Sequence, residues 1–179
     1  MSKYSLAGSA GKISNKTFKR FLEELGSKNP TPGGGAVAAM SGAMAASLVE
    51  MVCNLTKDKR ANTLKTKALK YKKEFQKLAD DDVDAFNLVM KNWKTNKRKS
   101  SLKKAADVPL KVALLSVEVE KLAKQLIKFG NKNAYSDTKT AIHLSKAAKA
   151  SALENVKINL VMIKDKRFTD RVKKAIIHI

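Results

Sequence analysis

Asp82 is the first candidate for a catalytic residue, because it lies in a helical stripe of apolar side chains. At 100° per residue, the members of this stripe fall within about 40° of one line; they are Tyr71, Phe75, Leu78, Phe86, Val89 and Trp93. A carboxylate among aromatic side chains is costly unless it is paired, hydrogen-bonded or protonated. Burial would raise its pKa toward neutrality, which suits a general acid–base group. Geometry alone leaves a salt bridge to a lysine as an equal alternative.

Three further aspartates surround this position. Asp80, Asp81 and Asp84 are expected to point sideways or to the opposite face of the helix, where carboxylates are ordinary. They therefore serve as internal comparisons for Asp82.

A second polar set follows one side of a later helix, with Asp137 and Asn155 near its two ends. The two residues are five turns apart, or about 27 Å along the axis, so one small group cannot contact both. Asp137 is expected to cap its helix, with a catalytic role as the alternative. Asn155 lies on a face expected to be buried, where it could hydrogen-bond a bound heterocycle. His143 points away from this face.

The segment "NPTPGGGAVAAMSGAMAASLVEMVCNLT" places Gly33, Gly34 and Gly35 directly before a helix rich in small residues. These glycines are expected to reach backbone angles closed to other residues and to let a ligand approach the main chain. The free amides and positive dipole end of the helix suit a carbonyl or carboxylate. Gly-Lys-Ser/Thr is absent, which excludes a phosphate-binding P-loop. The alternative is an ordinary loop before a core helix.

The elements that must position these residues are all helical by periodicity, and no alternating strand pattern is found. The pattern predicts a short helix capped by Ser14 and stopped by Gly26, and longer helices at about 36–55, 64–93, 102–129 and 136–159. Ser136 or Asp137 is expected to cap the 136–159 helix, and a last helix covers 169–177. Pro109 should bend the 102–129 helix. The predicted fold is all-α: residues 1–179 form a single-domain helical bundle, which is expected to pair into a homodimer through the Ala/Gly/Ser face of the 36–55 helix.

Composition limits the classes of function. Lys and Arg number 37 against 16 Asp and Glu, giving a net charge of +21. Such an excess attracts polyanions. Because the lysines are spread along the chain and no nucleic-acid motif is present, a solvated basic surface or one serving an anionic small substrate is favoured over nucleic-acid binding.

The lone Cys53 excludes an internal disulfide framework and suits the cytoplasm. With His143 and His178 as the only histidines, no zinc-type cluster is expected. The polar start of the chain carries no apolar signal-peptide core. The Ala-rich 36–53 stretch is interrupted by Ser and Glu, so a buried helix is expected and a membrane span is not.

Five segments occur in a fixed order: "NPTPGGGAVAAMSGAMAASLVEMVCNLT", "LADDDVDAF", "AADVPLKVA", "GNKNAYSD" and "NVKINL". Together they resemble the formiminotetrahydrofolate cyclodeaminase / methenyltetrahydrofolate cyclohydrolase family, over about residues 18–168. "MVCNLT" and "GNKNAYSD" are more similar to the stand-alone microbial cyclohydrolases than to the cyclodeaminase half of the bifunctional animal enzyme.

The resemblance implies an all-helical homodimer acting on the one-carbon bridge between N5 and N10 of tetrahydrofolate, with no cofactor besides the folate substrate. The second aspartate of the family's acidic pattern matches Asp82, which implies a catalytic role. The substrate-binding positions that the resemblance implies are Gly33, Gly34, Gly35, Asp137, Asn155, Asn159 and, from the basic turn "KDKRAN", Lys57, Lys59 or Arg60. Of these three basic residues, Lys59 is taken as the candidate.

Three functions remain open. The first is hydrolysis of 5,10-methenyltetrahydrofolate to 10-formyltetrahydrofolate, which is the expectation. The second is the ammonia-releasing cyclisation of a formiminotetrahydrofolate. The third is a non-catalytic basic helical protein that binds folate or nucleic acid. The expected partners are a folate, with or without a polyglutamate tail, and a second copy of the chain.

Overall fold

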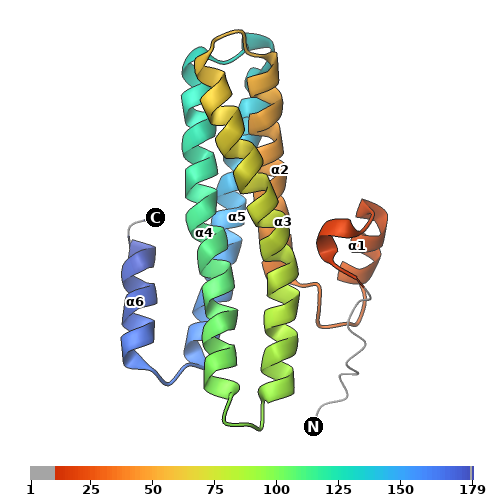
Figure 1. The fold of residues 1–179 in the computed structure, drawn as a ribbon, viewed down its shortest axis with the longest axis vertical. Coiled ribbons are helices and arrows are strands. Elements are labelled where there is room, and N and C mark those ends of the chain that lie inside the picture. Colours follow the sequence, from red (N-terminus) through yellow and green to blue (C-terminus); the bar gives the residue numbers. More distant parts are fainter. Residues whose placement is uncertain (1–10, 178) are drawn as a thin grey trace.

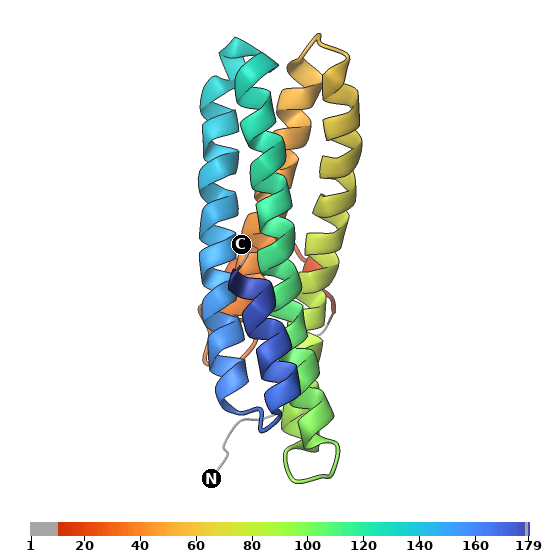
Figure 2. The ribbon, with the colours of Figure 1, turned by 90° about the vertical axis from the view of Figure 1, so that its left-hand side faces the viewer.

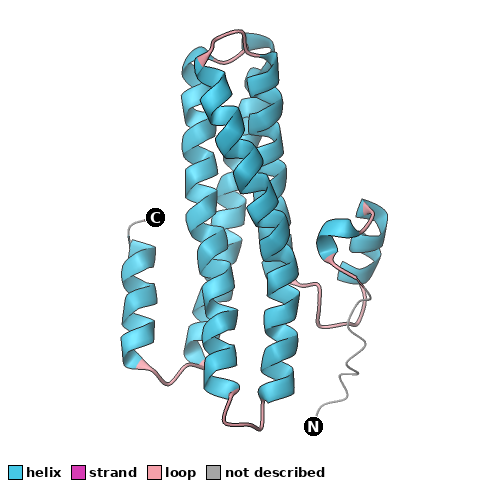
Figure 3. Cartoon of the chain, viewed as in Figure 1, coloured by secondary structure: helices cyan, strands magenta, loops and turns pink. Residues whose placement is uncertain are grey.

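The structure, a computed structural model, describes residues 11–177 and 179, and all its regular elements are helices (Figures 1 and 3). Their order is the 3₁₀ turn η1 (Ile13–Asn15), α1 (Phe18–Leu25), α2 (Gly34–Leu55), α3 (Arg60–Asn92), α4 (Arg98–Phe129), the 3₁₀ turn η2 (Lys132–Ala134), α5 (Tyr135–Val161) and α6 (Lys166–Ile177). The prediction of a single all-α domain is confirmed. The predicted bounds of the long helices are right to within about four residues.

The four long helices α2 to α5 form an up-down-up-down bundle, in which short turns join neighbouring antiparallel helices (Figures 1 and 2). Helix α2 packs against α3 and α5, and α4 packs against the same two helices from the other side. The α2–α3 and α4–α5 connections lie at one end of the bundle, and the α3–α4 turn lies at the other (Figure 1). A residue's position along its helix therefore decides which end of the molecule it reaches.

The Ala/Gly face of α2 packs inside the chain, whereas the sequence expectation gave this face to a second subunit. Its Ala and Gly residues are buried inside the chain, whereas Met44, Met51 and Leu55 of the larger apolar face are exposed. A Cβ on Gly42 would overlap the ring of the fully buried Phe75, so the small side chains serve to bring α3 close. The Ala/Gly face is buried within the bundle, so a second subunit cannot contact it.

By length and composition alone, α2 could cross a membrane, as buried core helices often can. Contacts with α3, α4 and α5 account for its apolar character here, because they bury its small-residue face. The sequence expectation of a core helix agrees with this packing.

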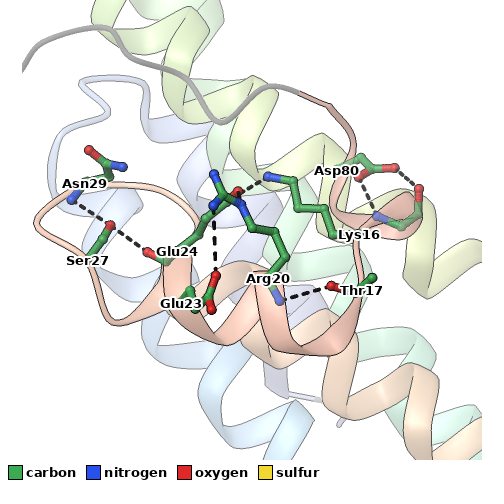
Figure 4. A network of polar contacts seen from close by, with 9 residues as sticks. Lys16, Thr17, Arg20, Glu23, Glu24, Ser27, Asn29 and Asp80 are labelled. Atoms are coloured by element: carbon green, nitrogen blue, oxygen red, sulfur yellow. Dashed lines mark hydrogen bonds and ion pairs between the residues drawn. The ribbon is translucent and has the colours of Figure 1, made fainter.

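Helix α1 and the turn before it attach to α3 through polar contacts (Figure 4). Thr17, rather than Ser14, caps α1 by accepting from the backbone of Arg20. Ser14 instead donates to the Asp80 carboxylate from its backbone nitrogen (3.1 Å) and its hydroxyl (2.7 Å). Asp80 is thus half-buried and holds the η1 turn against α3. This corrects the expectation that it would be an ordinary carboxylate on an outward face of the helix.

A buried carboxylate anchors α1 itself. Glu24 pairs with Lys16 and with Arg20 (2.8 Å to Nε), as Figure 4 shows. The hydrogen bond from Lys16 is the main reason why the pKa of Glu24 is lowered, ahead of the opposing effect of burial. Because both cations favour the ionised form, Glu24 acts as a fixed charge in the fold.

Helix α6 lies along the lower half of α4 and α5 (Figure 2). Its Phe168 and Val172 join a second apolar cluster with residues of α3, α4 and α5, among them Val89 and Val156. Asp165 caps the helix by accepting from Phe168 (3.0 Å), and two lysines of α4 hold its pKa well below the usual range. This cluster stiffens the end of the bundle at which α2 begins.

Candidate functional site

The Asp82 carboxylate lies against the first turn of α2. A Cβ on Gly35 would overlap its Oδ1 atom, so the carboxylate occupies the space that a side chain at position 35 would need. The backbone N–H of Ala36 donates to the same carboxylate. The first amides of a helix have no partner within it, and the positive end of the helix dipole favours an anion. The glycine loop and Asp82, 47 residues apart in the chain, therefore form one unit.

Burial raises the pKa of Asp82 from its ordinary value of 3.8 to about 6, and the Ala36 N–H opposes this only in part. The structure gives the carboxylate no salt bridge: among the described residues, no lysine or arginine pairs with it. The alternative of a lysine partner is thus set aside. A carboxyl group whose pKa is near 6 can both accept and return a proton near neutral pH.

Asp82 opens into a cavity of about 380 Å³. This volume lies in the range of small-molecule sites. The cavity is enclosed by the loop before α2 and by faces of α2, α3, α4 and α5; its lining residues are Pro30, Thr31, Gly33, Gly34, Gly35, Asp82, Ala85, Phe86, Val89, Met90, Trp93, Ala105, Asn155, Ile158, Asn159 and Met162. Within this lining, Asp82 is the one ionisable side chain, and it faces apolar and amide groups.

The two asparagines of α5 contribute amide groups to the cavity. Asn155 donates to the carbonyl oxygen of Ser151 (2.9 Å), and its amide lies beside Gly34. Asn159 donates to the carbonyl oxygen of Ala105 (2.9 Å), which ties α5 to α4. No described residue donates to either amide oxygen, so both remain able to accept from a ligand. The expectation that Asn155 would face a heterocycle site fits this position.

The glycine loop does not work in the expected way. Among the described residues, Gly11 alone has a positive φ, and Gly33 has the extended angles φ −129° and ψ −160°. The loop therefore needs no backbone angle that is closed to other residues. The requirement for glycine at position 35 is steric, since Asp82 fills the place of a Cβ, whereas a Cβ on Gly34 would meet Asn155 at an ordinary 3.6 Å.

Two candidates lie outside this cavity. Lys59 is exposed at the start of α3, about 34 Å along the helix from Asp82. Asp137 lies in the first turn of α5, about 27 Å from Asn155. Asp137 does not cap α5, since the N-cap residue is Ala134; it instead favours the helix by its charge near the N-terminus. Within one chain, neither residue can act together with Asp82.

Near Lys59 and Asp137, at the far end of the bundle, motif residues hold two turns together. Asn131, of "GNKNAYSD", donates from its backbone N–H to Thr56 Oγ1 (3.0 Å) and from its side-chain amide to the Leu55 carbonyl oxygen (2.8 Å). Arg60 lies 4.2 Å from the centre of the Phe129 ring and pairs with Asp58. These contacts join the α2–α3 turn to the α4–α5 turn.

Several cavity residues were missed from the sequence as site residues. Phe86 and Trp93 were recognised only as members of the apolar stripe, Met162 only as a residue on the same helix side as Asn155, and Ile158 not at all. Ile158 follows Asn155 by three residues, which places it on nearly the same face of α5, so periodicity could have supplied this signal.

Metal and thiol chemistry find no support in the described residues. No group of three or more His, Cys, Asp or Glu side chains gathers there in a way that could hold a metal ion. His143 is exposed, and His178 lies outside the described residues. Cys53 is buried, which raises the pKa of its thiol to about 11.

Among the described residues, the cavity has one carboxylate, Asp82, which is without a salt bridge and lies against the N-terminal turn of α2 in a helical bundle, and this arrangement defines the class of site. The chain belongs to the formiminotransferase-cyclodeaminase family, whose model matches residues 17–178. It is 36% identical to the methenyltetrahydrofolate cyclohydrolase of Methylorubrum extorquens, over 87% of this chain and 85% of that protein. It is 28% identical to the formimidoyltransferase-cyclodeaminase of Sus scrofa, over 95% of this chain but 35% of that longer protein.

A solved structure shares the fold. The crystal structure of formiminotetrahydrofolate cyclodeaminase from Thermotoga maritima matches with a TM-score of 0.88 and 33% identity, over 92% of this chain and 88% of that one. The family resemblance seen in the five sequence segments is thus confirmed over nearly the whole chain.

Proposed function

We propose that this protein is a methenyltetrahydrofolate cyclohydrolase, which hydrolyses 5,10-methenyltetrahydrofolate to 10-formyltetrahydrofolate. The observation that carries the proposal is the Asp82 carboxyl group, whose pKa is about 6, in a cavity of about 380 Å³ without another ionisable side chain. The similarity to the Methylorubrum extorquens cyclohydrolase supports the choice of reaction.

The chemistry of the substrate matches such a cavity. The methenyl bridge is a cationic amidinium carbon, and an ionised carboxylate stabilises a cation beside it. Asp82 accepts a proton from water as the water oxygen bonds to the bridge carbon. The bond from that carbon to N5 then breaks and the proton passes to N5. The remaining proton of the former water leaves the oxygen for solvent as the C=O bond forms, so the formyl group stays on N10 and one proton is released overall. Water and substrate are the only reactants, so the reaction needs no cofactor.

The other residues of the cavity hold the substrate in place. Phe86 and Val89 supply apolar walls that exclude bulk water, which strengthens the interaction between carboxylate and cation. The amide oxygens of Asn155 and Asn159 can accept hydrogen bonds from the amino and N–H groups of the pterin ring. Gly33 and Gly34 let the ring lie against the main chain.

A second candidate is the cyclodeaminase reaction, in which N10 attacks a formimino carbon and ammonia departs. The similarity to the Thermotoga maritima cyclodeaminase favours it, and the same carboxylate could move the protons. Purified protein should be given each folate separately while the methenyl absorbance is followed. Hydrolysis lowers that absorbance and cyclodeamination raises it. If the absorbance changes with neither folate, both reactions are refuted, and the remaining function is that of a non-catalytic binding protein.

The proposed working form is a cytoplasmic homodimer. The exposed Met44, Met51 and Leu55 of α2 give a continuous apolar face that a second copy could cover. Lys59 and Asp137 would have a part in catalysis only if a second copy brought them to the cavity. Sedimentation at micromolar concentration tests the dimer, and a monomer there would refute it.

A further inference from the structure

Pro109 interrupts the hydrogen bonds of α4 beside the Asp82 cavity. It lies inside the helix and is fully buried. In an α-helix each N–H donates to the carbonyl four residues earlier, so the Ala105 carbonyl would ordinarily accept from the N–H at position 109. Proline has no N–H, and its ring pushes against the carbonyl four residues earlier. The Ala105 carbonyl is therefore without its usual partner in α4.

The replacement for this partner comes from α5. The side-chain Nδ2 of Asn159 donates to the Ala105 carbonyl oxygen (2.9 Å), and both residues line the Asp82 cavity. A shielded carbonyl without a partner is costly, so this bond offsets the one that Pro109 removes. A hydrogen bond within α4 has thus been exchanged for a link between α4 and α5.

The link fixes the direction of the Asn159 amide. A carbonyl oxygen only accepts, so the donor Nδ2 must face Ala105 and the acceptor Oδ1 must face away from it. Asn155, one turn earlier on α5, shows the alternative, because its Nδ2 donates to the Ser151 carbonyl of its own helix. With the Ala105 carbonyl already occupied, Asn159 would have only the same choice.

We propose that Pro109 is a positioning residue: by withholding an N–H from Ala105, it holds the Asn159 amide with its oxygen ready to accept from an N–H donor of the substrate. This assignment rests on the proposed function, in which the donor belongs to the pterin ring. A helix interior is an unfavourable place for proline, and the directed acceptor gives the residue a reason to be there. Pro109 itself is outside the cavity lining and acts through Asn159.

The main test is Pro109→Ala, which returns an N–H to Ala105. The matched control is Val108→Ala, because Val108 is the buried neighbour and loses as many carbon atoms without any change of a backbone N–H. Nitrogen-15 NMR of the Asn159 side-chain amide, assigned by its loss in Asn159→Ala, reports the link without any need for activity. We expect this signal to shift in Pro109→Ala and to stay in place in Val108→Ala.

Methenyl hydrolysis reports the consequence for the substrate. Loss of one ordinary hydrogen bond should raise KM of Pro109→Ala by about 3- to 10-fold. Its kcat should stay within about twofold, because a binding interaction has been removed. In the Asn159→Ala background, Pro109→Ala should have no further effect on KM, since the residue through which it acts is gone. Val108→Ala should match the parent in both constants.

A second variant tests the link from the side of α5. Asn159→Asp keeps the shape of the side chain but replaces the donor by an oxygen, which the Ala105 carbonyl repels. We expect KM to rise, although a free carboxylate would attract the cationic substrate. Adding Pro109→Ala should lower KM again, because the new N–H engages the Ala105 carbonyl and removes the repulsion. Pro109→Ala should therefore raise KM in the parent and lower it in the Asn159→Asp background.

An unmoved Asn159 signal or an unchanged KM in Pro109→Ala would overturn the assignment. An equal rise of KM in Val108→Ala would do the same, because packing would then explain the effect, and so would a full effect of Pro109→Ala in the Asn159→Ala background. If Pro109→Ala does not fold, Asn159→Asp decides alone, and a KM at or below that of the parent refutes the proposal. If the parent hydrolyses no methenyltetrahydrofolate, the proposed function fails and the assignment falls with it; a shifted Asn159 signal would then locate the error in the substrate and not in the link.

Discussion

Replacing Asp82 by Asn is the sharpest test of the site. Asn keeps the shape of the side chain and can still accept from the Ala36 N–H, but it neither ionises nor takes a proton. A general acid–base group typically contributes 10²–10⁴-fold, or roughly 3–5 kcal/mol of barrier. We expect Asp82→Asn to fold, to bind folate, and to lose turnover by at least about 100-fold, measured as the loss of methenyl absorbance.

The same substitution should affect stability in a pH-dependent way. The folded-state pKa of Asp82, about 6, lies above the ordinary 3.8, so between these values the folded state binds more proton than the unfolded state. Stability from this group therefore falls as pH rises from about 4 to 6, and the loss is complete above that range. A difference of about two pH units corresponds to about 3 kcal/mol at most. Urea unfolding at pH 7.5 should show Asp82→Asn equal to or more stable than the parent, and at pH 4 the two should agree.

The activity of the parent protein should depend on the same ionisation of Asp82. If Asp82 is the base, kcat/KM should rise with pH through an apparent pKa near 6. The matched control is Asp84→Asn, because Asp84 is exposed on the same helix. Turnover of Asp82→Asn within a few-fold of the parent, or equal damage by Asp84→Asn, would refute the assignment. A loss of folding in Asp82→Asn would show that the carboxylate is structural.

Four further substitutions test the packing of the bundle and of its site. Gly35→Ala should push a Cβ into the Asp82 carboxylate and so reduce both turnover and thermal stability. Gly34→Ala is the control: it has room for its Cβ and should fold as well as the parent. Gly42→Ala should destabilise by about 1–3 kcal/mol in urea unfolding, because the added methyl overlaps a buried ring of α3; an unchanged midpoint would contradict this packing. Asp80→Asn should cost about 0.5–1.5 kcal/mol through a lost hydrogen bond to the η1 turn, with turnover nearly unchanged; a 100-fold loss of turnover would contradict its structural role.

Local features of the sequence were enough to find Asp82. Its position in an apolar stripe depends only on the 3.6-residue period of a helix, and this period does not change when the helix packs. The stripe was right for the buried Phe75, Leu78 and Val89. For helix α2, the prediction of a subunit contact through the Ala/Gly/Ser face was wrong, because a period shows that two faces differ without showing which neighbour each one meets. There the close approach of α3 selected the small residues, and the larger ones stayed outside.

The sequence by itself determined the all-helical class, the order of the long helices and the acid on which the proposed chemistry depends, since each follows from periodicity and composition along one helix. The tertiary structure alone decided which residues share a site. It placed Asp82 against Gly35 and Ala36 and brought Asn155 and Asn159 into the same cavity. It also left Lys59 and Asp137 at the far end of the bundle. The physical reason is that the four long helices are rigid rods of about 33 to 50 Å. The position of a residue along its rod, and the direction in which the chain returns, therefore decide which side chains meet, whatever their separation in sequence.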